Sequence, residues 1–137
     1  MSESIELARR EVWQAADGMA QASARLLEYR IARAASLSDA QAAQLEQLEN
    51  ELDQMVVLLR SRGVQLVGAG AAEAAAGLMG AIRLGREALG QMSDVNSLIR
   101  AASSLFDLAV ALLGRNPGPA LKAIRTLHEL ADEQGLV

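Results

Sequence analysis

The sequence predicts an all-α protein, a bundle of about five helices that opens with a long antiparallel helical hairpin. Apolar residues make up 51% of the 137 residues but aromatic residues only 2%, so small and aliphatic side chains must build the core. Helix-favouring alanine, leucine, glutamate and arginine are abundant, whereas the chain holds only two prolines. A chain of this length can bury a sufficient core as one unit, so we expect a single domain over residues 1–137.

The first helix is expected from about Ser4 to about Ala35. Apolar residues recur along it at spacings of three and four, which places them on one stripe of the helix. The stripe consists of Ile5, Ala8, Val12, Ala15, Met19, Ala22, Leu26 and Tyr29. A stripe of this kind packs against another helix, and its heptad spacing is typical of a coiled coil.

The second helix is expected from about Asp39 to Arg62 and should fold back on the first. Ser38 and Gln41 have the spacing of a capping box, and Gly63 suits the left-handed residue that ends a helix. Large side chains dominate its stripe and can fit against the alanines of the first helix. This stripe consists of Leu45, Leu48, Leu52, Met55 and Leu59. Residues 1–62 therefore predict a coiled-coil-like hairpin.

The same helix carries an acidic run formed by Glu46, Glu49, Glu51 and Asp53. We expect all four carboxylates on the solvent-facing side, away from the leucine stripe. Exposed carboxylates keep ordinary chemistry, so the run predicts a solvated surface and no acid–base or cation site.

Residues 63–137 predict a Gly/Ala-rich segment followed by two amphipathic helices. From Val64 to Ile82 only Gln65 and Glu73 interrupt an apolar run. The simplest interpretation is a small-residue helix buried between neighbours, because pairs such as Gly70 and Ala74 allow close helix contact. Two alternatives stay open. The segment could be a hinge, since repeated glycines lower helix stability, or it could contact a membrane.

The fourth helix is expected between a cap at Ser93 or Asp94 and a stop at Gly114, and the fifth from Pro117, after an Asn116 cap, to about Gln134. The apolar face of the fourth helix is the surface expected to be shared with a partner or a second copy. The interface candidates are Leu98, Leu105, Phe106 and Leu112. Trp13 is a further candidate anchor, although a lone tryptophan beside the first stripe also fits the edge of the core.

No catalytic, cofactor-binding or metal-binding site is expected. The chain has no cysteine, and its glycines match no phosphate-binding loop. The single histidine, His128, has Asp132 one turn further on, which is at most half of a metal site. We therefore expect a non-enzymatic protein without a cofactor, although an active site built from scattered helix residues would leave no local motif.

The net charge of −4 is spread over both halves of the chain, so we expect no basic face and no nucleic-acid binding. Twelve arginines against one lysine, in an alanine-rich chain, are typical of a GC-rich bacterial genome, so a bacterial or phage origin is expected. The acidic N-terminal residues differ from a secretory signal, which predicts a cytoplasmic protein and leaves non-classical secretion open.

These features predict an interaction or assembly protein that forms a homo-oligomer or covers the apolar surface of a protein partner. The alternative is a membrane-active protein that exposes residues 64–82 and 99–113 as an apolar helical hairpin.

Overall fold

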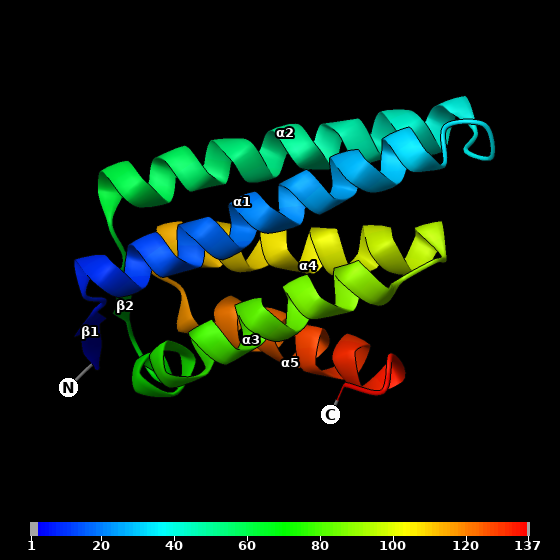
Figure 1. The fold of residues 1–137 in the computed structure, drawn as a ribbon. Helices are drawn as coiled ribbons and strands as arrows, with labels where there is room; N and C mark the ends of the chain where they lie inside the picture. Colours follow the sequence, from blue (N-terminus) through cyan, green and yellow to red (C-terminus); the bar gives the residue numbers. More distant parts are fainter. Residues whose placement is uncertain (1–2, 137) are drawn as a thin grey trace.

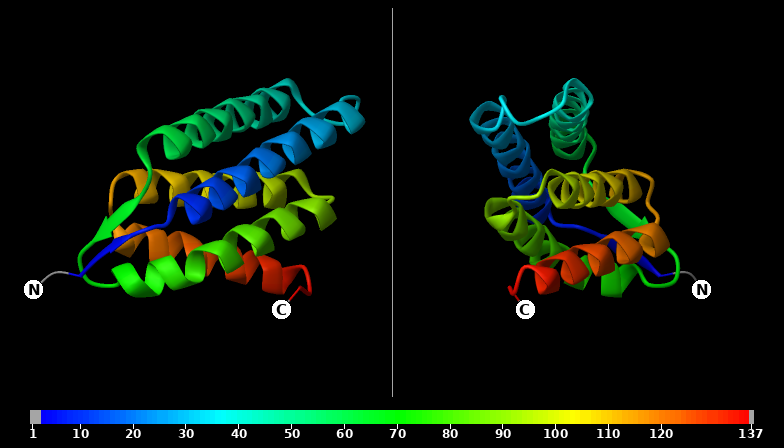
Figure 2. Two further views of the ribbon diagram at one scale, coloured as in Figure 1. Left: turned by 60° about the vertical axis from the view of Figure 1, so that its left-hand side comes forward. Right: turned by 90° about the vertical axis from the view of Figure 1, so that its right-hand side faces the viewer.

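The computed structural model describes residues 3–136 and confirms the all-α class. Over these residues the chain forms five helices and one two-stranded antiparallel sheet (Figure 1). In chain order the elements are β1 (Ser4–Glu6), α1 (Arg9–Ala32), α2 (Asp39–Arg62), β2 (Gln65–Val67), α3 (Ala71–Gln91), α4 (Val95–Leu113) and α5 (Pro117–Glu133). The α1–α2 pair lies over α3 and α4, and α5 packs against the far side of α3 and α4 (Figure 2).

The predicted helical hairpin is confirmed, because α1 and α2 lie side by side and run in opposite directions (Figure 1). Most residues of the predicted stripes form the buried faces of these helices, but Ile5 and Met55 are only half-buried and Ala8 is exposed, and Ile5 and Ala8 lie before α1 begins. The buried stripe residues are Val12, Ala15, Met19, Ala22, Leu26 and Tyr29 on α1 and Leu45, Leu48, Leu52 and Leu59 on α2. Small side chains on one helix thus meet large ones on the other, as ridges-into-grooves packing requires.

Several helix ends follow the local signals. Gln41 N–H donates to Ser38 Oγ at 3.1 Å and Ser38 N–H donates to Gln41 Oε1 at 3.0 Å, which completes the predicted capping box. Gly63 has a φ of +71° where α2 ends. The Asp94 carboxylate accepts two backbone N–H groups in the first turn of α4. Asn116 precedes α5 as predicted, but its side chain makes no capping hydrogen bond.

The expectation of a helix beginning at Ser4 is wrong. Residues Ser4–Glu6 form β1, which pairs antiparallel with β2 so that Ile5 lies opposite Leu66, and α1 begins only at Arg9. The backbone groups of this segment are satisfied by a strand some sixty residues away along the chain. Helical periodicity cannot reveal a partner so distant in sequence.

The Val64–Ile82 run is not one helix, which corrects the simplest interpretation of that segment. Its first residues form β2, Gly68 and Gly70 then turn the chain with φ values of +116° and +88°, and α3 begins at Ala71. Glu3 fixes this start, because its Oε2 accepts the N–H groups of Gly70 at 2.9 Å and Ala71 at 3.1 Å. A carboxylate at a helix N-terminus also complements the helix dipole.

Close helix contact by small residues occurs where α1 crosses α3. A Cβ placed on Gly18 would lie closer than 3.0 Å to Cγ2 of Ile82, so the two helices can approach only because residue 18 has no side chain. Around Gly80 on α3 the same test finds open space. Glycine is therefore required at certain helix contacts and not at others. One required position lies on α1, where the glycine spacing in the sequence did not indicate a close helix contact.

By length and composition, α4 is the one helix of residues 3–136 that is long and apolar enough to cross a membrane. Half of its most apolar stretch is buried inside the bundle, and core helices of soluble proteins have the same composition.

Candidate functional site

The leucines expected to form an interface lie inside the bundle. Leu98 and Leu105 are 0% exposed, Leu112 is 1% exposed, and Phe106 is half-buried against the same core. α4 packs against α2, α3 and α5, so its apolar stripe is already covered by the chain's own helices. These leucines cannot contact a partner while the bundle stays folded. Trp13, in contrast, is 41% exposed.

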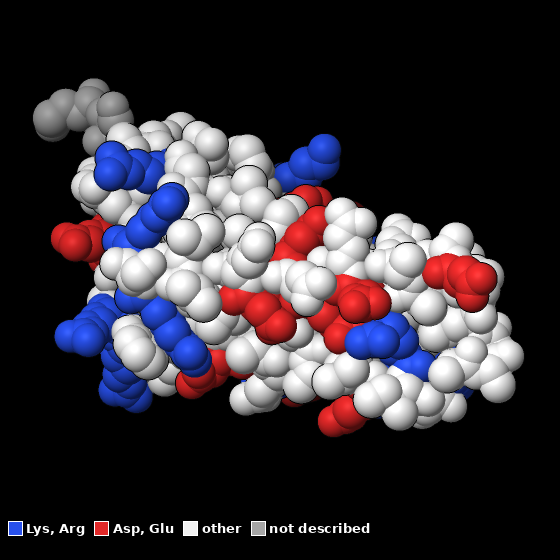
Figure 3. Space-filling model, turned by 90° about the horizontal axis from the view of Figure 1, so that it is seen from above, with Lys and Arg blue, Asp and Glu red and all other residues white. Residues whose placement is uncertain are grey.

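A cleft of about 650 Å³ opens beside Trp13, at the end of the bundle where α1 begins and α2 ends. Arg9, Arg60, Arg62 and Arg115 line it, and we call it the arginine cleft. In the view from above the α1–α2 pair, basic side chains gather at the left end of the molecule (Figure 3). Glu6 is the one carboxylate residue in its described lining. The expectation that no basic face is left over is therefore wrong at this end.

Three separate parts of the fold supply the four arginines. Arg9 is the first residue of α1, Arg60 and Arg62 belong to the last turn of α2, and Arg115 lies in the turn between α4 and α5. Basic and acidic residues are spread evenly along the sequence, so the sequence alone does not reveal this cluster of arginines. The cluster forms only where the ends of the helices meet in space.

Trp13 is held at the rim of the cleft by two guanidinium groups. The Cζ atoms of Arg60 and Arg9 lie 4.9 Å and 6.0 Å from the centre of its ring, within the range of cation–π attraction. Arg60 also forms an ion pair with Asp17. Arg60 therefore helps to hold the indole in place, and its positive charge is already paired with Asp17.

The other three guanidinium groups of the cleft lack such a partner. Within residues 3–136, no carboxylate lies within 4.0 Å of a side-chain nitrogen of Arg9, Arg62 or Arg115. Like charges gathered around one cleft repel one another, and their summed field attracts the opposite charge. The cleft therefore favours an anionic group.

Arg115 has an unusual backbone, with a φ of +63°, the only positive φ among the described non-glycine residues. Its N–H donates to Leu112 O at 3.2 Å, and Asn116 N–H donates to Ala111 O at 2.9 Å. This is the Schellman pattern that ends a helix, in which glycine normally occupies the left-handed position. An arginine there carries a strain of about 1–2 kcal/mol.

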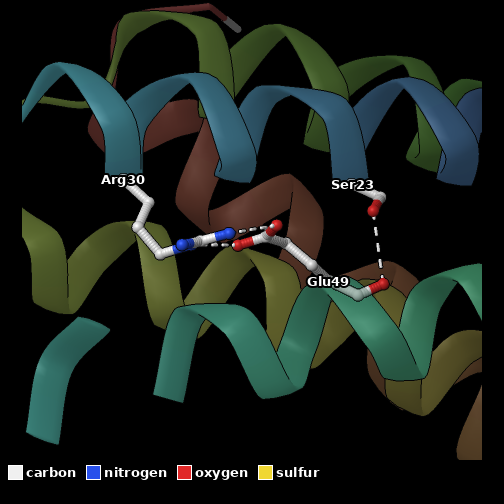
Figure 4. Close-up of polar contacts among 3 residues, drawn as sticks. All are labelled: Ser23, Arg30 and Glu49. Carbon is white, nitrogen blue, oxygen red and sulfur yellow. Dashed lines mark hydrogen bonds and ion pairs between the residues drawn. The ribbon is translucent and has the colours of Figure 1, made fainter. Parts of the chain in front are cut away.

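A second charged contact lies between α1 and α2 and corrects the interpretation of the acidic run. Glu49 is only 7% exposed, because it follows Leu45 by four residues and so lies on the buried stripe. Arg30 Nε and Nη2 donate to its two carboxylate oxygens at 2.8 and 3.1 Å (Figure 4). This hydrogen bond raises the pKa of Arg30. Ser23 Oγ donates to the backbone oxygen of Glu49 at 3.2 Å.

The Arg30–Glu49 pair joins α1 to α2 and does not line the arginine cleft, so we assign it the role of fixing how the two helices align. His128 is exposed beside a small groove that Glu73 also lines. Among residues 3–136, no group of three His, Asp or Glu side chains is placed to hold a metal ion.

Sequence reasoning missed the arginine cleft, although two local signals point to it. Arg9 and Trp13 are four residues apart, the spacing of neighbours on a helix face, and both are exposed. In addition, an arginine follows Gly114 at a helix end where glycine is the usual residue.

Comparison of the chain with protein-family models gave no match, and comparisons with curated proteins and with solved structures gave none either.

Proposed function

We propose that this chain is a non-enzymatic protein-binding domain that docks a partner through the arginine cleft and Trp13 at its rim. The observation that carries the proposal is an exposed indole with the guanidinium groups of Arg9 and Arg60 over its ring, in a cleft where three of the four arginines have no carboxylate partner in the described chain. Tryptophan and arginine are the residues most enriched among those that dominate binding energy at protein interfaces.

The partner is an acidic segment of another protein. Charge complementarity supports this choice, since the lining holds four arginines and one glutamate. The cleft volume of about 650 Å³ also has room for a few side chains of an extended segment. A second copy of the chain is the competing partner, and the oligomeric state distinguishes the two.

The membrane-active alternative is supported by the composition of α4. It requires residues 64–82 and 99–113 to leave the bundle together. The first of these runs is divided between β2, a glycine turn and α3, whose start is tied to Glu3. We therefore favour the docking function, which needs no unfolding.

The test uses Trp13 as a reporter, because it is the only tryptophan of the chain. A glutamate-rich peptide is titrated at low salt, and binding is followed by tryptophan fluorescence and calorimetry. Arg9→Ala should weaken binding by about tenfold, the value of one charge-assisted hydrogen bond. Arg125→Ala, which removes an exposed arginine of α5 outside the cleft, should leave the affinity unchanged.

Light scattering on the free protein over about a hundredfold range of concentration gives the oligomeric state. A monomer that binds the peptide supports the proposal. Absence of peptide binding at low salt, or equal weakening by Arg9→Ala and Arg125→Ala, would refute it. A concentration-dependent oligomer that Trp13→Ala dissociates would identify a second copy as the partner instead.

A further inference from the structure

We infer that the arginine cleft recognises a phosphorylated side chain on the partner's acidic segment. The inference rests on the proposed docking function and names the group that the cleft binds. Arg9, Arg62 and Arg115 share one cleft and are free of ion pairs with described residues. A phosphate monoester carries a charge of about −1.5 to −2 and three acceptor oxygens, whereas a carboxylate carries one charge and two oxygens.

The arginines of the cleft can supply N–H donors for the larger charge and the additional oxygen of a phosphate. Each guanidinium group presents several N–H donors in a planar fork suited to phosphate oxygens. A single carboxylate can engage one such fork fully, so it would leave the remaining guanidinium charges without a partner. A phosphate can accept hydrogen bonds from more than one arginine at once, so it can use several of the three guanidinium groups.

The backbone conformation of Arg115 supports the same inference independently. Its backbone is pinned on both sides, since its N–H donates to Leu112 O and its carbonyl oxygen accepts the N–H of Val67 at 3.2 Å. The chain nevertheless places arginine in a left-handed conformation at the helix-ending position that glycine would occupy without strain. A strained residue that the surrounding structure holds firmly is a mark of a functional site. Arg115 is also one of the residues that line the cleft, so the strained position coincides with the site.

One substitution at Arg115 should have opposite effects on stability and on binding. Arg115→Gly removes the strain, so the thermal midpoint of unfolding should rise. The same substitution removes a phosphate ligand, so the affinity for a phosphopeptide should fall by about tenfold. A merely structural arginine would give a lower midpoint, or an unchanged affinity.

The experiment compares three peptides that share one acidic sequence and differ at one position, with phosphoserine, glutamate or serine. Binding is measured by calorimetry and by Trp13 fluorescence. The phosphopeptide should bind about tenfold more tightly than the glutamate peptide. Arg115→Gly and Arg62→Ala should each reduce this preference, and Arg125→Ala should preserve it. Arg62 is exposed at the end of α2, so its variant tests the cleft without changing a strained turn.

The outcomes separate this inference from the proposed function. Equal affinity for the phosphoserine and glutamate peptides would overturn the phosphate inference and leave acidic docking in place. Binding of neither peptide would overturn both. Inorganic phosphate that binds as tightly as the phosphopeptide would show that the site takes a free phosphate compound, and binding to phosphatidylserine vesicles in the absence of phosphopeptide binding would point to a lipid headgroup. Either result would overturn the phosphopeptide as the ligand.

Discussion

The close crossing of α1 and α3 at Gly18 gives a quantitative prediction for Gly18→Ala. The added methyl group would lie closer than 3.0 Å to Cγ2 of Ile82, a distance that real Cβ atoms essentially never show. Cγ2 is bonded directly to the branched Cβ of Ile82, and such a side chain has one strongly preferred rotamer in a helix. The methyl groups can therefore separate only if the helices move apart.

The magnitude follows from two opposing effects. Overpacking of a well-packed core costs about 1–3 kcal/mol, and replacing glycine by alanine inside a helix contributes about 1 kcal/mol of stability. Gly80→Ala on α3 is the matched control, because a Cβ there meets open space and only the helix-propensity gain applies. The two variants should thus differ by about 2 kcal/mol, with Gly18→Ala the less stable. For a chain of 137 residues this corresponds to about 7 °C between their thermal midpoints.

Chemical denaturation followed by far-ultraviolet circular dichroism measures both stabilities. A double-mutant cycle with Ile82→Ala then identifies the cause, because that substitution deletes Cγ2. The double variant should be more stable than the sum of the single effects by about 1–3 kcal/mol. Ile82→Val retains two methyl groups on Cβ and should give no such relief. If Gly18→Ala stabilises the protein as much as Gly80→Ala does, the close approach of α1 and α3 is wrong.

Three further predictions concern the polar contacts. Glu3→Ala removes the cap of α3 and should lower stability by about 1 kcal/mol, with faster amide exchange in the first turn of α3, whereas Glu3→Gln keeps an acceptor oxygen and should lose less. Hydrogen bonds from Ser97 lower the pKa of Asp94. This carboxylate therefore stabilises the fold above its ordinary pKa, and the contribution disappears as the pH falls through the lowered value. In an acid titration, Asp94→Asn should flatten the loss of stability below about pH 4. Arg30→Ala and Glu49→Ala should each destabilise the hairpin in thermal unfolding, and the double variant should lose less than their sum; additive losses would contradict a coupled pair.

The helices and their packing faces follow from local patterns in the sequence. The leucine and alanine stripes fix which sides of α1 and α2 are buried, and Ser38 with Gln41 fixes where α2 begins. These features depend on residues within a few positions of one another, so the chain's own periodicity reveals them. The same periodicity also shows that α4 buries an apolar face. It cannot show whether that face is covered by helices of the same chain or by a partner.

Features that depend on distant segments were decided only by the tertiary structure. The pairing of β1 with β2, the Glu3 cap on α3 and the contact of Gly18 with Ile82 each join residues about sixty positions apart. The arginine cleft is of the same kind, because Arg9, Arg62 and Arg115 belong to different helix ends that meet only when the bundle closes. The sequence by itself determined most of the helical segments, the caps of α2 and α4 and most of the buried faces, since these arise from interactions between near neighbours. The tertiary structure decided the strand pair, the covering of α4 and the site, because charge and shape at a surface depend on where separate segments come together.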